Sequence, residues 1–213
     1  MPTANVNGIQ LFYELAKTDG QPLVLVHGSW ESHADWEQVV PPLSETFRVL
    51  TYDRRGHSQS ERPPGGDSIH DDVTDLAALM ETLGLAPAWI VGNSFGASIS
   101  LRLALDRSDL LRGLLVHEPP LLSLLADDPE AAPMLEDVKA QVDAVLERIA
   151  TGDHEAAAQQ FIETVAIGPG AWAEIPPENR RILIDNASTF LDESRDPDQF
   201  TFDLGRAGAI SEP

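Results

Sequence analysis

The residues best suited to chemistry lie around Ser94, in the segment Gly92-Asn93-Ser94-Phe95-Gly96. The segment has the spacing G-x-S-x-G, with a glycine two positions before and two positions after the serine. Small residues at these positions let a strand and the following helix approach closely across a sharp turn, from which the serine hydroxyl projects. At a helix start, backbone N–H groups and the helix dipole favour a negative charge that develops on a substrate oxygen. The pattern therefore predicts nucleophilic attack by Ser94 on a carbonyl group.

The elements that must position Ser94 are also indicated by the sequence. Short apolar runs, typical of strands buried on both faces, occur at 23–26, 47–52, 89–91 and 114–116. Helical patterns alternate with them at 36–45, 71–83 and 95–105, and an Asn-Gly pair within 6–15 predicts a hairpin. The alternation predicts an α/β fold with a mostly parallel, doubly wound sheet and helices on both faces.

Two further motifs accompany the serine turn. The first is His27-Gly28-Ser29-Trp30, which follows a buried strand and can turn backbone N–H groups towards Ser94. The second is the segment 52–60, which reads YDRRGHSQS and follows the next strand. With the three motifs in this order, the sequence resembles the α/β-hydrolase family, in detail over residues 1–118. The second motif departs from the family pattern at Ser58, where glycine is usual.

The resemblance implies a set of site residues. Ser94 would be the nucleophile, and the backbone N–H groups of Ser29 and Phe95 would form the oxyanion hole, with no cofactor and no metal. Serine at the turn is unlike the haloalkane dehalogenases and epoxide hydrolases of the family, which use aspartate. It leaves open esterases, carbon–carbon bond hydrolases and cofactor-free haloperoxidase-like enzymes. We expect an esterase-like serine hydrolase that acts on a small ester or related carbonyl substrate through an acyl-enzyme.

The base that should activate the serine is not evident. A serine nucleophile needs a base, usually a histidine oriented by a carboxylate, and in this family the chain order is serine, acid, histidine. Only His117 and His154 follow Ser94. One hypothesis is that the chain lacks the C-terminal part of the fold, including the last strands, and has impaired activity on its own. The alternatives are His117 as base with Glu118 as orienting acid, and a non-catalytic protein that binds a small molecule.

Other polar residues are assigned structural roles. His27 precedes Ser94, which is the wrong order for the family's base, and it is predicted to pack the loop. Asp53 and Arg55 are predicted to brace their own loop through a charge-assisted hydrogen bond. The histidines predicted to lie on loops or helix surfaces are His33, His57, His70 and His154.

The strand pattern ends near residue 118. Beyond it, apolar residues recur three and four positions apart, and further helices are predicted at 155–165 and 178–190. We expect residues 1–118 to form the hydrolase core, 119–206 a helical cap, and 207–213 the start of the return to the core. Without later strands, the strand at 114–116 or its neighbour would form an open edge. Such an edge can pair with another chain, so a homo-oligomer is one of the expected possibilities.

Composition limits the partners. The chain has 35 acidic and 14 basic residues, a formal net charge of −21, so its field repels phosphate groups. We therefore expect a small-molecule substrate, and neither nucleic acid nor a membrane as a partner. With no cysteine, no basic start followed by an apolar run, and no long apolar segment, the expectation is a soluble cytoplasmic protein.

Overall fold

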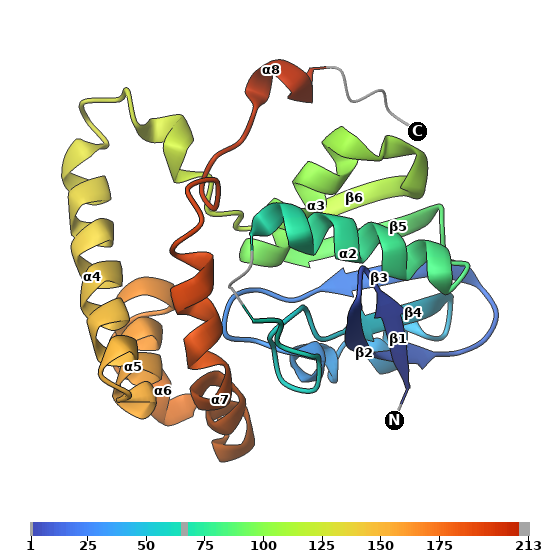
Figure 1. Ribbon diagram of the computed structural model, residues 1–213, viewed down its shortest axis with the longest axis horizontal. Helices are drawn as coiled ribbons and strands as arrows, with labels where there is room; N and C mark the ends of the chain where they lie inside the picture. The colour runs from blue at the N-terminus through green and yellow to red at the C-terminus, as the bar shows by residue number, and fades with distance from the viewer. Residues whose placement is uncertain (1, 65–67, 209–213) are drawn as a thin grey trace.

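The computed structural model describes residues 2–64 and 68–208 (Figure 1). Its sheet has six strands in the order β1-β2-β4-β3-β5-β6. Their bounds are Thr3–Val6 for β1, Ile9–Ala16 for β2, Gln21–Val26 for β3, Phe47–Tyr52 for β4, Ala88–Asn93 for β5 and Leu111–His117 for β6. Strands β3 to β6 are parallel to one another, whereas β1 and β2 form an antiparallel hairpin that pairs with β4. The predicted α/β fold with a mostly parallel sheet is confirmed.

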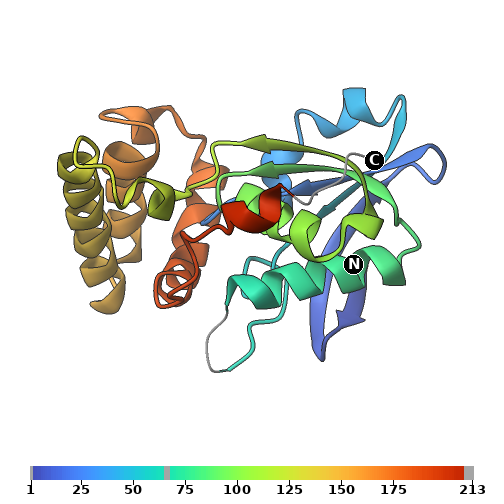
Figure 2. The same ribbon diagram turned by 90° about the horizontal axis from the view of Figure 1, so that it is seen from above.

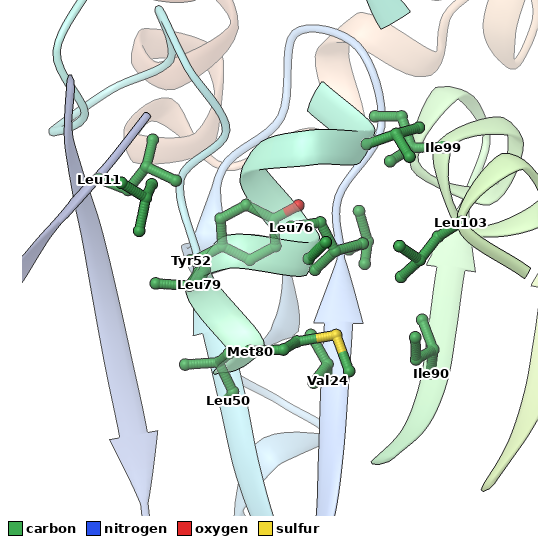
Figure 3. Close-up of a cluster of buried hydrophobic side chains, with 14 of the residues drawn as sticks. Leu11, Val24, Leu50, Tyr52, Leu76, Leu79, Met80, Ile90, Ile99 and Leu103 are labelled. Carbon is green, nitrogen blue, oxygen red and sulfur yellow. The ribbon is translucent and has the colours of Figure 1, made fainter. Parts of the chain in front are cut away.

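Two helices cover one face of this sheet. They are α2 (Ile69–Thr82) and α3 (Phe95–Asp106), and their apolar side chains interlock with those of the strands to form the main core. Figure 3 shows Leu76, Leu79 and Met80 meeting strand residues in this layer. Because α3 starts directly after β5, the packing of α3 against the sheet fixes the turn that contains Ser94.

The opposite face is covered over β3 and β4 by two short helical pieces, η1 (His33–Trp36) and α1 (Val40–Leu43). The continuous helix predicted over 36–45 is therefore wrong. Pro41 and Pro42 lack the backbone N–H groups that a helix running through them would need, so they are tolerated only in the first turn of α1.

One end of the sheet is open in the described structure, because β6 is its outermost strand. On the face away from α2 and α3, Trp89 of β5 is 42% exposed and Leu115 of β6 is 58% exposed. The open edge predicted at 114–116 is therefore present.

After His117 the described residues form helices and loops. The elements are η3 (Leu122–Leu125), α4 (Ala132–Ala150), α5 (His154–Phe161), the π-helical turn η4 (Ile162–Ala166), α6 (Ala171–Glu174), α7 (Pro177–Glu193) and α8 (Leu204–Ala207). Helices α4, α5 and α7 pack around an apolar cluster of their own and stand beside the sheet as a separate layer (Figures 1 and 2). We call this helical unit the cap.

The expected return of the chain to the core at 207–213 falls mostly on residues 209–213, which lie outside the described residues. Within the described ranges, no helix combines the length and apolar character that a membrane crossing needs.

Candidate active site

Ser94 occupies the turn between β5 and α3 with φ 50° and ψ −119°, a conformation that non-glycine residues rarely adopt. The turn is held by backbone hydrogen bonds. The Ser94 N–H donates to the carbonyl of His117 over 2.9 Å, and the Ser94 carbonyl accepts from Ala97 and Ser98. The residue is partly exposed, and its hydroxyl forms no hydrogen bond with the described residues. The hydroxyl is thus held on a strained turn and left free.

Both glycines of the motif are required by close backbone contacts. A Cβ atom on Gly92 would lie 2.5 Å from the carbonyl oxygen of Gly96. A Cβ atom on Gly96 would lie 2.3 Å from the carbonyl oxygen of Val26 and 2.4 Å from that of His27. These distances are far below a van der Waals contact, so only glycine lets α3 approach β5 and the end of β3 this closely.

The loop after β3 lies against this turn. A Cβ atom on Gly28 would be 3.1 Å from the Cβ of Ser94 and 3.4 Å from the carbonyl oxygen of Asn93. Neither the Ser29 N–H, which follows Gly28, nor the Phe95 N–H, at the start of α3, has an acceptor among the described residues. Two unpaired amides on segments that meet at a serine are the elements from which an oxyanion hole is built.

His27 is buried beneath this loop. Its Nδ1 donates to the Gly28 carbonyl over 2.8 Å, and its Nε2 accepts from the Arg54 N–H over 3.0 Å. Burial, together with the charge of Arg54, lowers the pKa of His27 to about 3, so the ring is neutral at ordinary pH. These contacts give His27 a structural role in the loop.

Glu31 is a neighbour of Ser94 that the sequence motifs did not single out. Its Oε2 accepts from the Gly28 N–H over 2.7 Å, and the Asn93 Nδ2 donates to its Oε1 over 3.0 Å. Burial of the carboxyl group, reinforced by the charge of Asp35, raises the pKa of Glu31 to about 7. The available signal was its position, since an acidic residue four places after His27 must lie in the loop predicted to face the nucleophile.

Asp53 braces its own loop as predicted, because its Oδ2 accepts from the backbone N–H of Gln59 over 3.0 Å, but it does not pair with Arg55. Asp53 Oδ1 accepts from the backbone N–H of His33 over 2.8 Å and lies 2.7 Å from its Nδ1. Arg55 Nε donates to Asp75 Oδ2 over 2.7 Å. The two side chains leave the loop in different directions, Asp53 towards η1 and Arg55 towards α2. Although burial opposes charge on both groups, the Asp53–His33 hydrogen bond lowers the pKa of Asp53 and raises that of His33.

Arg54, between them, is fully buried and links the core to the cap. Its guanidinium donates to Asp72 on α2 over 3.0 Å, to the Gly28 carbonyl over 3.2 Å and to Glu193 on α7 over 2.5 Å. Buried ion pairs persist only where several hydrogen bonds compensate for lost hydration, and these three contacts provide them.

His57 lies on a loop, as predicted, but it is buried there, which the sequence did not indicate. Its Nδ1 donates to the Arg55 carbonyl over 2.9 Å, and its Nε2 lies 3.0 Å from the hydroxyl of Thr189 on α7. Burial and the neighbouring charge of Arg54 hold the pKa of His57 well below its usual value. The cap covers this loop, and nothing in the local sequence around residue 57 indicates that contact.

The cap also packs against the loop after β3, and Trp30 of that loop provides the contact. This residue is fully buried with φ 68°, and its ring lies 5.0 Å from that of Phe161 and 5.2 Å from that of Phe190, between centroids. Trp30 therefore belongs to the apolar cluster of the cap although its backbone belongs to the core.

Asn186 on α7 adds polar contacts between the cap and the same loop. Its Nδ2 donates to the carbonyls of Trp30 over 3.1 Å and Glu31 over 2.9 Å. Its Oδ1 accepts from the Ser58 N–H over 2.8 Å. Ser58 has φ 44°, in the region where glycine is favoured, which explains why glycine is usual at this position of the resembled motif.

The family follows from comparison with known proteins. A family model described as the alpha/beta hydrolase fold matches residues 21–186. The chain belongs to the alpha/beta hydrolase fold family. A solved alpha/beta hydrolase from Sphaerobacter thermophilus is similar over 100% of this chain and 79% of its own, with a TM-score of 0.78 and 28% identity.

Curated relatives of this alpha/beta hydrolase match its core. A soluble epoxide hydrolase of Corynebacterium sp. (strain C12) is 35% identical over 113 residues, which is 53% of this chain and 39% of the relative. A putative carbamate hydrolase RutD of Caulobacter segnis is 37% identical over 119 residues, 54% of this chain and 45% of the relative. The matched part of the chain thus spans less than half the length of these two relatives.

Neither of the two histidines that follow Ser94 in this alpha/beta hydrolase places its ring on the Ser94 hydroxyl, although the backbone carbonyl of His117 accepts from the Ser94 N–H. The exposed ring of His117 bonds through Nδ1 to Asn93 Oδ1 over 2.8 Å, and His154 begins α5 in the cap. Glu118 is exposed, with its Oε1 3.9 Å from His117 Nδ1. The described residues thus place the segments that carry the Ser29 and Phe95 amides against the turn of Ser94, the predicted nucleophile, without a histidine ring on the serine hydroxyl.

Proposed function

We propose that this alpha/beta hydrolase is a serine hydrolase of the esterase kind, with Ser94 as nucleophile and a small ester or related carbonyl compound as substrate. The observation that carries the proposal is the free hydroxyl of Ser94 on a strained turn. Two unpaired amides, those of Ser29 and Phe95, lie on the segments that meet at this turn. Strain of this kind persists only where the surrounding structure enforces it, and it is concentrated at reactive positions.

The reaction would proceed through an ester of the enzyme. Ser94 Oγ attacks the carbonyl carbon, its proton passes to a base, and the carbonyl oxygen becomes an oxyanion bound by the Ser29 and Phe95 amides. The oxyanion collapses with loss of an alcohol, which takes up the proton. Water then attacks the acyl-enzyme, releases the carboxylic acid and restores the serine. Each oxyanion donor contributes about 10² to 10³ in rate.

The choice of a serine mechanism depends on residue 94 itself. The relatives include an epoxide hydrolase and a putative carbamate hydrolase, which support hydrolysis as the general chemistry but differ from each other in substrate. A serine attacks carbonyl carbon readily, so a carbonyl substrate suits this chain better than an epoxide.

The test is hydrolysis of a simple aryl ester together with covalent labelling by a fluorophosphonate. In the labelling step Ser94 Oγ displaces fluoride from phosphorus, and the hydroxyl proton passes to solvent. We expect labelling at Ser94 and ester hydrolysis that Ser94→Ala abolishes. The matched control Ser108→Ala, at an exposed serine beyond α3, should leave both unchanged.

A binding function without turnover is the second candidate, and it is favoured by the lack of a histidine bonded to Ser94 among the described residues. The cap also contains a mostly apolar cavity of about 370 Å³, whose lining includes Leu122, Leu135, Val142 and Phe200. Equal ester hydrolysis by the wild type and Ser94→Ala, with no labelling of Ser94, would exclude serine catalysis and leave this candidate.

A further inference from the structure

Glu31 is placed between the two segments that form the candidate site. An atom at the Cβ position of Gly28 would lie 3.1 Å from Glu31 Oε2 on one side and 3.1 Å from Ser94 Cβ on the other. The carboxyl group therefore lies just across Gly28 from the nucleophile. Its hydrogen bonds reach both segments, to the Gly28 N–H on the loop after β3 and to the Asn93 side chain on the turn.

The hydrogen bonds of Glu31 join the loop after β3 to the Ser94 turn, and we call the contact between these two segments the junction. The Asn93 Nδ2 donates to both oxygens of Glu31, over 3.0 and 3.3 Å, and the Gly28 N–H donates to Oε2. Asn93 Oδ1 in turn bonds the His117 ring. The Gly28 amide is thus engaged, whereas the next amide of the loop, that of Ser29, has no acceptor among the described residues.

We propose that Glu31 is a positioning residue for the reaction at Ser94, whose ionised carboxylate ties the loop after β3 to the nucleophile turn and so holds the Ser29 amide in place. The proposal rests on the proposed function of Ser94. It assigns to Glu31 no contact with the substrate, because the side chain acts through Gly28 and Asn93.

The ionisation of Glu31 should control how well it performs this role. An ionised carboxylate accepts hydrogen bonds at both oxygens. A protonated carboxyl group carries a hydrogen on one oxygen, and in Glu31 that hydrogen would point at an N–H donor and weaken the hydrogen bond there. Burial and the charge of Asp35 raise the pKa of Glu31 to about 7, and the hydrogen bonds together with the charge of Arg54 oppose that rise. The junction should therefore tighten as the pH rises through neutrality.

The experiment compares fluorophosphonate labelling rates of the full chain and of Glu31→Gln across pH. Glutamine keeps the size but turns an NH₂ group towards a donor, so it imitates the protonated acid at every pH. At about pH 8 we expect Glu31→Gln to react about 10- to 100-fold more slowly, the loss that a displacement on the order of 1 Å produces. At about pH 5.5 the two rates should converge, because Glu31 itself is then protonated.

Asp35→Asn is the matched control. Asp35 accepts from the Ser32 N–H over 2.8 Å, a bond that asparagine can keep, and it acts on Glu31 only through charge. Asp35→Asn should keep the rate at high pH and move the inflection to lower pH. A purely structural effect of Glu31→Gln would lower the rate equally at all pH values.

The outcomes separate this inference from the proposed function. Suppose that the wild type is labelled at Ser94. The positioning role is then overturned, while serine reactivity stands, if the labelling rate of Glu31→Gln is lower than that of the wild type by the same factor at every pH. It is overturned as well if the two rates are equal throughout, or if Glu31→Gln is labelled faster at high pH. If Ser94 is not labelled at all, both proposals fall. Thermal unfolding of Glu31→Gln, measured alongside, verifies that the variant is folded when its rate is compared.

Discussion

The ion pair between Arg54 and Glu193 predicts a stability difference between two adjacent positions of one helix. Arg54 and Glu193 are 1% and 6% exposed, and they join the core to the cap. The preceding residue on α7, Asp192, bonds Arg62 over 2.6 Å, but the side chains of Asp192 and Arg62 are 17% and 39% exposed. The two pairs have the same chemistry and almost the same location, and they differ mainly in burial.

Glu193→Gln should destabilise the protein by about 3 kcal/mol, the low end of the cost of removing one partner from a buried pair. We take the low end because Arg54 keeps its bonds to Asp72 and to the Gly28 carbonyl. Asp192→Asn should cost no more than ~1 kcal/mol, the range for exposed pairs.

Urea unfolding followed by far-ultraviolet circular dichroism measures both free energies. A change of about 3 kcal/mol corresponds to a fall in Tm of roughly 6–12 °C for a chain of this size. Equal losses of unfolding free energy in Glu193→Gln and Asp192→Asn would refute the reasoning, because burial would then make no difference to how much an ion pair contributes to stability. A stabilised Glu193→Gln would refute it as well.

Three further predictions concern the loop and turn near Ser94. Gly96→Ala should destabilise by about 3 kcal/mol or prevent folding, since its Cβ meets two backbone oxygens, whereas Gly208→Ala, with open space around it, should be neutral in the same urea titration. Ser94→Gly should abolish labelling yet raise the free energy of unfolding by about 1–3 kcal/mol, because glycine relieves the strained φ. The pKa of Glu31 is higher in the folded state than in the unfolded state, so the folded state binds the Glu31 proton more tightly. The free energy of unfolding should therefore fall by up to ~3 kcal/mol as the pH rises from 4.5 to about 7. In Glu31→Gln, this dependence of the unfolding free energy on pH should be absent.

The sequence was sufficient for features that depend on nearby residues. The buried runs became β3 and β4, and the glycines around Ser94 predicted a turn that the backbone contacts of Gly92 and Gly96 require. The one helix predicted wrongly, at 36–45, contains two consecutive prolines, a local signal that outweighs the apolar spacing.

The features that were missed depend on contacts between distant parts of the chain. His57 is buried by Thr189, which lies 132 positions further on, and Arg54 is paired with Glu193, 139 positions further on. Local pattern contains no information on which loop the cap will cover. The pKa of Glu31 depends in the same way on burial that only the assembled loop creates.

The burial of Trp30 among Phe161 and Phe190 has a consequence for protein engineering. Exchanging residues 119–206 for the equivalent unit of another family member would remove the aromatic neighbours of the Trp30 indole. The loop after β3, which lies against the Ser94 turn, would then lose the packing that holds it to the cap. A chimera would have to carry matching partners for that one side chain, or replace it together with the transplanted unit.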